Sequence, residues 1–229
     1  MISLENIRKS YRLPQGRFEA LSGVDFEVDA GEFVAIVGPS GSGKSTLINM
    51  ITGIDRPDSG EVHVAGQRLT KLGENRIAKW RGQHVGVIFQ FFQLLPTLTV
   101  LENVMLPMNY GGTYKNEREA RAMRLLDRVN MAGDADKFPS QISGGQQQRA
   151  AIARALANDP KILVGDEPTG NLDAASAETI FNLFGELAFQ GLTIVIVTHD
   201  QTLAARVPRM IHVDSGQIIS DNMRAPTFA

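Results

Sequence analysis

Three almost uninterrupted apolar runs dominate the pattern of this chain. They cover residues 33–37, 162–164 and 193–197, and Thr193 is the one polar residue among them. A strand buried on both faces has this composition, which is typical of parallel sheets. Shorter segments in which apolar and polar residues alternate predict strands with one buried face. They lie at residues 2–4, 26–28 and 62–64.

Helical spacing appears between these strands. Apolar residues recur at the intervals of an amphipathic helix in two sets. They are Ala122, Leu125, Leu126 and Val129, then Ile180, Leu183, Phe184 and Leu187. Residues 146–157 are rich in alanine and arginine and predict a further helix. Residues 91–158 contain no strand-like run and are expected to be mainly helical. Because strands alternate with helices, we predict an α/β fold with a parallel sheet. Residues 223–229, at the end of the chain, are expected to fray.

Composition restricts the setting of this fold. Hydrophobic residues make up 43% of the chain and charged residues 21%, as in globular proteins, and the formal net charge is −2. This charge gives no support to a nucleic-acid partner. The chain has no cysteine, which excludes disulfides and thiolate metal sites. The N-terminus does not read as a secretory signal and no apolar run is long enough to span a bilayer, so we expect membrane contact to need a partner.

The stretch after the 33–37 strand is rich in glycine. It reads Gly38, Pro39, Ser40, Gly41, Ser42, Gly43, Lys44 and Ser45. This is the G-x-x-x-x-G-K-[ST] pattern of a phosphate-binding loop, placed between a strand and a helix as that loop requires. Lys44 is predicted to reach the β and γ phosphates, and the Ser45 hydroxyl to bind Mg²⁺. The structural alternative is a glycine-rich turn with an incidental lysine.

Two adjacent carboxylates follow the 162–164 strand. Asp166, at the end of a buried strand, is predicted to hold Mg²⁺ through its water shell. Glu167 is predicted to point elsewhere and to polarise an attacking water. On its own, Asp166-Glu167-Pro168 also fits a turn that ends a strand. The phosphate loop upstream favours the chemical interpretation.

A second helix start also suits an anion. Ser143, Gly144, Gly145 and Gln146 precede the predicted helix, and small residues at a helix start leave N–H groups open to phosphate. An isolated segment of this kind is a helix cap in most proteins. A single nucleotide in one domain needs one such start, whereas this chain has two, roughly a hundred residues apart.

With these motifs in this order, the chain resembles the ABC ATPase family along almost its whole length. Residues 38–45 resemble its Walker A loop, residues 143–146 its signature motif, and Asp166 with Glu167 its Walker B motif. The remaining matches are Tyr11 to the A-loop aromatic, Gln90 to the Q-loop glutamine, Asn171-Leu172-Asp173 to the D-loop and His199 to the switch histidine. Ile142 stands where the family usually has leucine, which is a conservative apolar change, and Gly165 stands where alanine is often found, a departure that changes little in this interpretation.

The resemblance implies a fold and its parts. A P-loop NTPase (RecA-like) core with a mainly parallel sheet would carry an N-terminal antiparallel β subdomain and an α-helical subdomain. We expect one ABC ATPase domain over residues 1–229. The β subdomain and core would occupy about 1–90 and 159–229, and the helical subdomain about 91–158.

It also implies a mechanism with ATP and Mg²⁺. Two copies would face each other head to tail, with each ATP between the Walker A loop of one and the signature motif of the other. Glu167 would be the general base, His199 would hold the γ-phosphate, and Gln90 would contact Mg²⁺ or the water. Tyr11 would stack on adenine, although a core aromatic is the alternative. Thr46 and Asp173 complete the expected nucleotide-binding set.

Within the family the resemblance is to the MacB, LolD and FtsE group. It implies transmembrane permease subunits as partners, a cytoplasmic location at the inner membrane face, and export, lipoprotein extraction or mechanical signalling as the task. The apolar stretch 91–101 is expected to line part of a groove for a permease helix. The alternatives are a soluble ABC ATPase acting on nucleic acid or ribosomes, and a different P-loop enzyme such as a small-molecule kinase. No long coiled-coil insertion supports the first, and the second leaves residues 143–146 unexplained.

Overall fold

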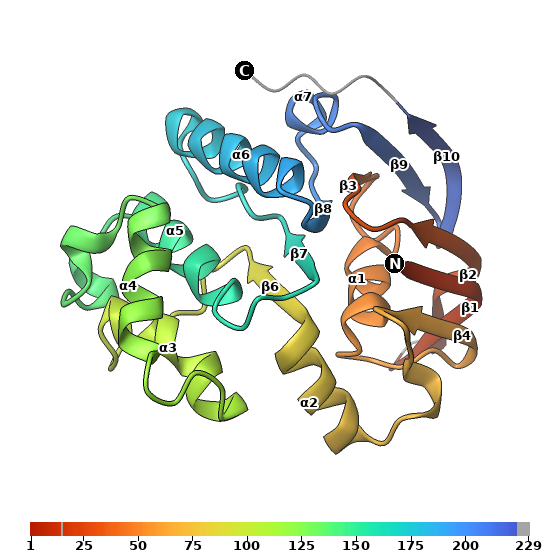
Figure 1. Cartoon of the computed structure of the whole chain (residues 1–229). Helices are drawn as coiled ribbons and strands as arrows, with labels where there is room; N and C mark the ends of the chain where they lie inside the picture. Colours follow the sequence, from red (N-terminus) through yellow and green to blue (C-terminus); the bar gives the residue numbers. More distant parts are fainter. Residues whose placement is uncertain (15, 224–229) are drawn as a thin grey trace.

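Two β-sheets and a layer of helices make up the fold (Figure 1). The computed structural model describes residues 1–14 and 16–223. Of the tail that was expected to fray, residues 224–229 lie outside this range. Met223 does not fray, because it is the last residue of a paired strand.

The larger sheet has the order β10-β9-β3-β8-β7-β6. Its strands are β3 (Phe33–Val37), β6 (Val85–Phe89), β7 (Ile162–Asp166), β8 (Thr193–Val197), β9 (Arg209–Asp214) and β10 (Gln217–Met223). Neighbours from β9 to β6 pair in parallel, and β10 pairs antiparallel with β9. The three apolar runs form β3, β7 and β8, which confirms the predicted parallel sheet.

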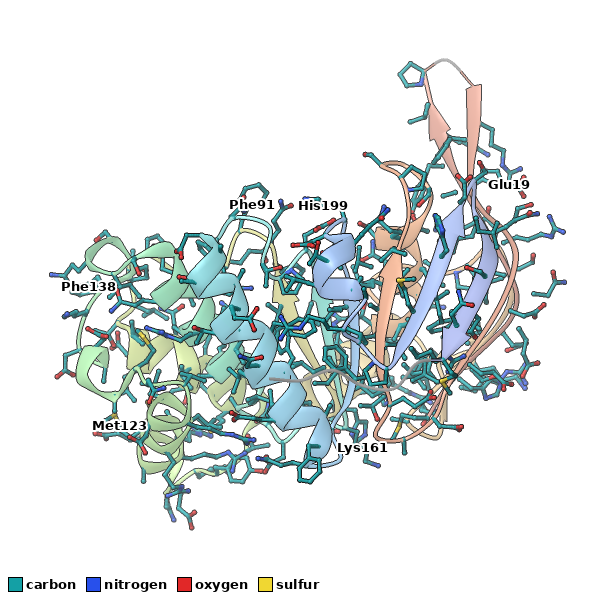
Figure 2. All side chains as sticks on the ribbon, turned by 90° about the horizontal axis from the view of Figure 1, so that it is seen from above. Glu19, Phe91, Met123, Phe138, Lys161 and His199 are labelled. Atoms are coloured by element: carbon teal, nitrogen blue, oxygen red, sulfur yellow. The ribbon has the colours of Figure 1, made fainter. Side chains whose placement is uncertain are left out.

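The smaller sheet is antiparallel, with the order β2-β1-β4-β5. It contains β1 (Ile2–Leu13), β2 (Gly16–Val28), β4 (Ser59–Val64) and β5 (Gln67–Arg68). The alternating segments form its buried positions, as predicted. The first two strands are longer than that alternation indicated and extend into a hairpin that projects from the body of the molecule (Figure 2).

Along the chain, the helices come between successive strands of the larger sheet. They are α1 (Lys44–Thr52), α2 (Glu74–His84), α3 (Val100–Gly111), α4 (Arg118–Arg128), α5 (Gly144–Ala155), α6 (Ala174–Phe189) and α7 (Gln201–Ala204), with 3-10 turns at Leu69–Lys71, Ala132–Asp134 and Pro139–Gln141. All of residues 91–158 are described and contain no strand, as expected. The helix expected from near Gln146 begins at Gly144, because Ser143 caps it.

Alternate residues of β3 face two separate hydrophobic clusters. Phe33, Ala35 and Val37 pack with residues of α3 to α6. Val34 and Ile36 pack with α1 and the antiparallel sheet. The larger sheet is therefore covered on both faces, which explains its continuous apolar composition (Figure 1). Among the described residues, no helix is long and apolar enough to cross a membrane.

The parallel register brings the candidate site residues to one edge of the larger sheet. Asp166 pairs with Phe89 on one side and with Val197 on the other. The residues that follow these strands therefore meet at the carboxyl end of the sheet, where ligands bind in open α/β folds. Figure 2 shows Phe91 and His199, which follow β6 and β8, on the same edge of the molecule.

Candidate nucleotide site

The loop between β3 and α1 has a backbone that requires glycine. Gly38 has a φ of 150° and Gly43 a φ of 105°, which L side chains rarely adopt. A Cβ on Gly38 would lie 1.9 Å from the Val213 carbonyl oxygen, and one on Gly43 would lie 2.4 Å from that of Ala20. No side chain of the described residues caps the start of α1, so its first N–H groups remain available to an anion.

Lys44 is folded back onto this loop. Its Nζ donates to the carbonyl oxygens of Gly38 and Pro39, at 2.9 and 2.7 Å. Among the residues that the structure describes, no carboxylate forms an ion pair with it, although it is buried. The Ser42 hydroxyl is also buried, and it has no hydrogen-bond partner within residues 1–14 and 16–223. A buried cation, an unsatisfied hydroxyl and an open helix start together fit a phosphate group.

Asp166 lies beside Ser45. Burial raises the pKa of Asp166 above its usual value, a hydrogen bond from Ser45 opposes this, and the charges of Glu167 and Lys44 act in opposite directions. Within the described part of the chain no three His, Asp or Glu side chains cluster as a metal cage. A carboxylate and a hydroxyl next to a phosphate loop suit Mg²⁺, which keeps water and phosphate oxygens as its other ligands. Gln90 lines the same pocket.

Glu167 and His199 contact each other directly. His199 Nδ1 lies 2.8 Å from Glu167 Oε2, and the His199 backbone N–H donates to the same oxygen at 3.3 Å. Glu167 has a φ of 51°, in the left-handed region that side chains other than glycine avoid. Strained backbone of this kind occurs where a side chain must point in one direction. The carboxylate is thereby turned into the pocket, with its side chain 17% exposed.

These residues line one pocket of about 400 Å³. Its lining consists of Phe18, Gly38, Ser40, Gly41, Gly43, Lys44, Ser45, Thr46, Gln90, Asp166, Glu167, Val197 and His199. The Walker A, Q-loop, Walker B and switch residues singled out in the sequence are therefore brought together. Phosphate, metal and an attacking water would meet between the carboxylates and the loop.

Tyr11 stands next to this pocket and does not line it. Its hydroxyl donates to Asp55 at 2.9 Å, and Lys9 Nζ lies 5.1 Å from its ring centre. Burial raises the pKa of Tyr11, while a hydrogen bond with Thr46, which does line the pocket, opposes the rise. The aromatic ring that lines the pocket is Phe18, the cross-strand partner of Tyr11. Phe18 could not be identified from the sequence, because its place in the pocket depends on the register between β1 and β2.

The signature segment lies outside the pocket. Ser143 is exposed, accepts from the Gln146 N–H at 3.3 Å, and its own N–H donates to Gln146 Oε1 at 2.8 Å. Gly145 is packed so closely that a Cβ there would lie 2.7 Å from Ser176 Oγ. Residues 143–146 thus form a capped helix start that does not line the pocket of this chain's own phosphate loop.

The D-loop segment, residues 171–173, contacts both the start of α6 and the Gln90 backbone. Asp173 caps α6 by accepting from the Ser176 N–H at 3.0 Å, and this bond lowers the pKa of Asp173. Asn171 Nδ2 donates to the Gln90 carbonyl oxygen at 2.9 Å. Asp173 lies outside the pocket, as the signature residues do.

Comparison with known proteins decides the family. The ABC transporter family profile matches residues 21–170 of this chain. The chain belongs to the ABC transporter family. It is 46% identical to an uncharacterized ABC transporter ATP-binding protein of Thermotoga maritima, over 95% of this chain and 93% of that protein.

Two further relatives are larger proteins. A pyoverdine export ATP-binding/permease protein of Pseudomonas syringae pv. tomato is 47% identical over 98% of this chain and 34% of its own length. A macrolide export ATP-binding/permease protein, MacB, of Rhodopirellula baltica is 43% identical over 99% of this chain and 34% of its own length.

A dimeric, post-hydrolysis structure of the ATP-binding cassette MJ0796 with ADP and Pi superposes with a TM-score of 0.91, at 40% identity over 98% of this chain and 100% of that one.

These findings confirm the P-loop NTPase fold and the ABC ATPase activity. The chain is an ATP-hydrolysing subunit of a transporter and uses ATP with Mg²⁺.

Proposed function

We propose that two copies of this chain close around ATP and thereby drive a membrane permease. The observation that carries the proposal is the separation of the signature segment from the pocket. Ser143 is exposed and lies outside the pocket that contains Lys44 and Glu167. A second copy would complete each site by presenting its own residues 143–146. The dimeric cassette among the structural relatives supports this arrangement.

Within that composite site we propose the following roles. Lys44 and the N–H groups of the loop bind the β and γ phosphates, and Ser45, Asp166 and Gln90 hold Mg²⁺. Glu167 accepts the proton of the attacking water, and His199 holds the γ-phosphate. Tyr11 stacks on adenine with Phe18 beside it, and Thr46 supports the phosphate end. Asp173 acts across the dimer interface. We also propose that the β subdomain and core occupy about 1–90 and 159–229, and the helical subdomain about 91–158.

A groove separate from the nucleotide pocket is proposed for the permease. Its volume is about 350 Å³, and its wall includes Ala78, Gly82 and Pro107. Only Gln93 of the apolar segment 91–101 lines it, and Leu95, which is 43% exposed, does not. We therefore place the docking site between α2 and the ends of α3 and α5. Relatives named ATP-binding/permease proteins support a permease partner, which would hold this chain at the inner face of the membrane.

Pull-down from membranes tests this proposal. Ala78 is exposed on the groove wall, so Ala78→Arg would obstruct docking without disturbing the core. Ala120→Arg is the matched control, because Ala120 is exposed on α4 away from the groove. We expect a permease to co-purify with the original chain and with Ala120→Arg, but not with Ala78→Arg.

If no permease co-purifies with the unaltered chain, the proposed permease partner is contradicted. Co-purification of ribosomes or nucleic acid instead would favour the soluble alternative. Equal recovery of the permease with both variants would contradict the location of the docking site.

A further inference from the structure

Arg154, in the last turn of α5, holds the backbone of a loop at the nucleotide pocket. Its guanidinium donates to the carbonyl oxygens of Phe92, at 2.8 Å, and of Gln93. Across the described ranges 1–14 and 16–223, no carboxylate forms an ion pair with Arg154. Burial lowers the pKa of Arg154, although an arginine stays charged in proteins. Its charge is therefore directed at this one loop.

The loop that Arg154 holds has a strained backbone. Phe92 has a φ of 54° and Gln93 a φ of 51°, both in the left-handed region. Two successive residues of this kind are disfavoured unless the surroundings hold them. The two carbonyl groups that Arg154 binds belong to these same residues. The hydrogen bonds thus stabilise the conformation that the local sequence disfavours.

The loop is fixed at its other end as well. Asn171 donates to the carbonyl oxygen of Gln90, and the Phe92 ring packs over the start of α5, where a Cβ on Gly144 would lie 3.5 Å from it. Gln90 itself lines the nucleotide pocket. Gln90 belongs to the same loop, so the contacts that hold Phe92 and Gln93 also restrain the backbone that carries the Gln90 amide.

We propose that Arg154 is a positioning residue for ATP hydrolysis, which fixes the 90–93 loop so that the Gln90 amide reaches the metal side of the pocket. This rests on the proposed role of Gln90 as a Mg²⁺ contact. Arg154 and Gln93 also line the groove assigned to the permease, so a docked partner would touch the same clamp.

Magnesium titration of ATP hydrolysis tests this role. Arg154→Lys keeps the charge, but a lysine does not reproduce the planar fork that binds two carbonyls. We expect the half-saturating Mg²⁺ concentration to rise about tenfold, as when other groups that orient metal ligands are lost. Affinity for a fluorescent ATP analogue in EDTA should stay unchanged, because the phosphate loop is untouched.

Arg121→Lys is the control variant. Arg121 also donates from a helix to a carbonyl, that of Ala157 at 2.7 Å, but away from the 90–93 loop. Its Mg²⁺ dependence should match that of the unaltered chain. If Arg154→Lys fails to fold, Arg154→Gln is tested in the same way, since its one NH2 group can still donate but lacks the charge and the fork of the guanidinium.

A double-mutant cycle with Gln90→Ala decides between positioning and general stability. If Arg154 acts through Gln90, then Arg154→Lys adds no further Mg²⁺ shift in the Gln90→Ala background. Additive shifts, or an unshifted Arg154→Lys that folds normally, would overturn the positioning role. A Gln90→Ala variant with unaltered Mg²⁺ dependence would instead reject the role of Gln90, and with it the route proposed for Arg154.

Discussion

Glu167→Gln replaces one carboxylate oxygen of the proposed base by an amide of nearly the same size. The carbonyl oxygen that remains can still accept from His199, whose Nδ1 lies 2.8 Å from the carboxylate. The Glu167 N–H donates to Val197 at 2.9 Å, and this bond does not depend on the side chain. The fold and ATP binding should therefore survive, while the ability to accept a proton is lost.

The size of the effect follows from that single loss. Positioned general bases contribute about 10²–10⁴-fold to rate. At 1.36 kcal/mol per factor of ten, the barrier should rise by about 3–5 kcal/mol. We expect turnover to fall by this factor, with the affinity for ATP unchanged within about twofold. ATP-bound dimers should accumulate, because hydrolysis no longer opens them.

Phosphate release and gel filtration with ATP measure these two results. Glu186→Gln is the control, since Glu186 is an exposed residue of α6 and the chemical change is the same. Both variants should keep the thermal stability of the unaltered protein. Hydrolysis by Glu167→Gln within about tenfold of normal would refute the assignment of Glu167 as base.

Two further predictions concern stability. Asn103 is fully buried and forms hydrogen bonds with the Leu95 N–H and with three carbonyl groups of residues 95–99. Asn103→Ala should therefore lower the free energy of unfolding in urea by about 2–4 kcal/mol. An unchanged urea midpoint would contradict a stabilising role of Asn103 for residues 95–99. Burial raises the pKa of Asp166 in the folded state, so its ionised form destabilises the nucleotide-free protein at pH values above that pKa. Asp166→Asn should therefore raise the Tm at pH 7, and this gain should shrink as the pH falls towards the ordinary pKa of 3.8. A gain in Tm that grows as the pH falls would contradict a raised pKa of Asp166 in the folded state.

Local signals were sufficient to predict the centre of the fold. The run at residues 33–37 is apolar because both faces of β3 are covered. The pattern Gly38 to Ser45 specifies its loop, since Gly38 and Gly43 are the positions at which a Cβ would collide with backbone. Asp166 and His199 could be placed in one site because parallel strands end at one edge. These features depend on neighbours in sequence or on the rule for parallel sheets.

The features that were missed have weak local signals or depend on contacts that the sequence does not show. Strands β9 and β10 were not predicted, although Ser215-Gly216 between them is a turn signal, because their alternation is short and half polar. Phe18 enters the nucleotide pocket through the register of a hairpin. Arg154 looked like an ordinary helix residue, because its partners lie about sixty positions earlier in the chain.

Mixing two inactive variants tests the central claim, that each ATP site is shared between two copies. Lys44→Ala removes the phosphate lysine of its own chain, and Ser143→Arg blocks the signature motif of its own chain. In a mixed dimer with shared sites, one site carries both lesions and the other carries none. An equal mixture should therefore regain ATP hydrolysis, up to about a quarter of the normal rate for random pairing and independent sites. A mixture that stays as inactive as either variant alone, although the chains form dimers, would contradict the shared site.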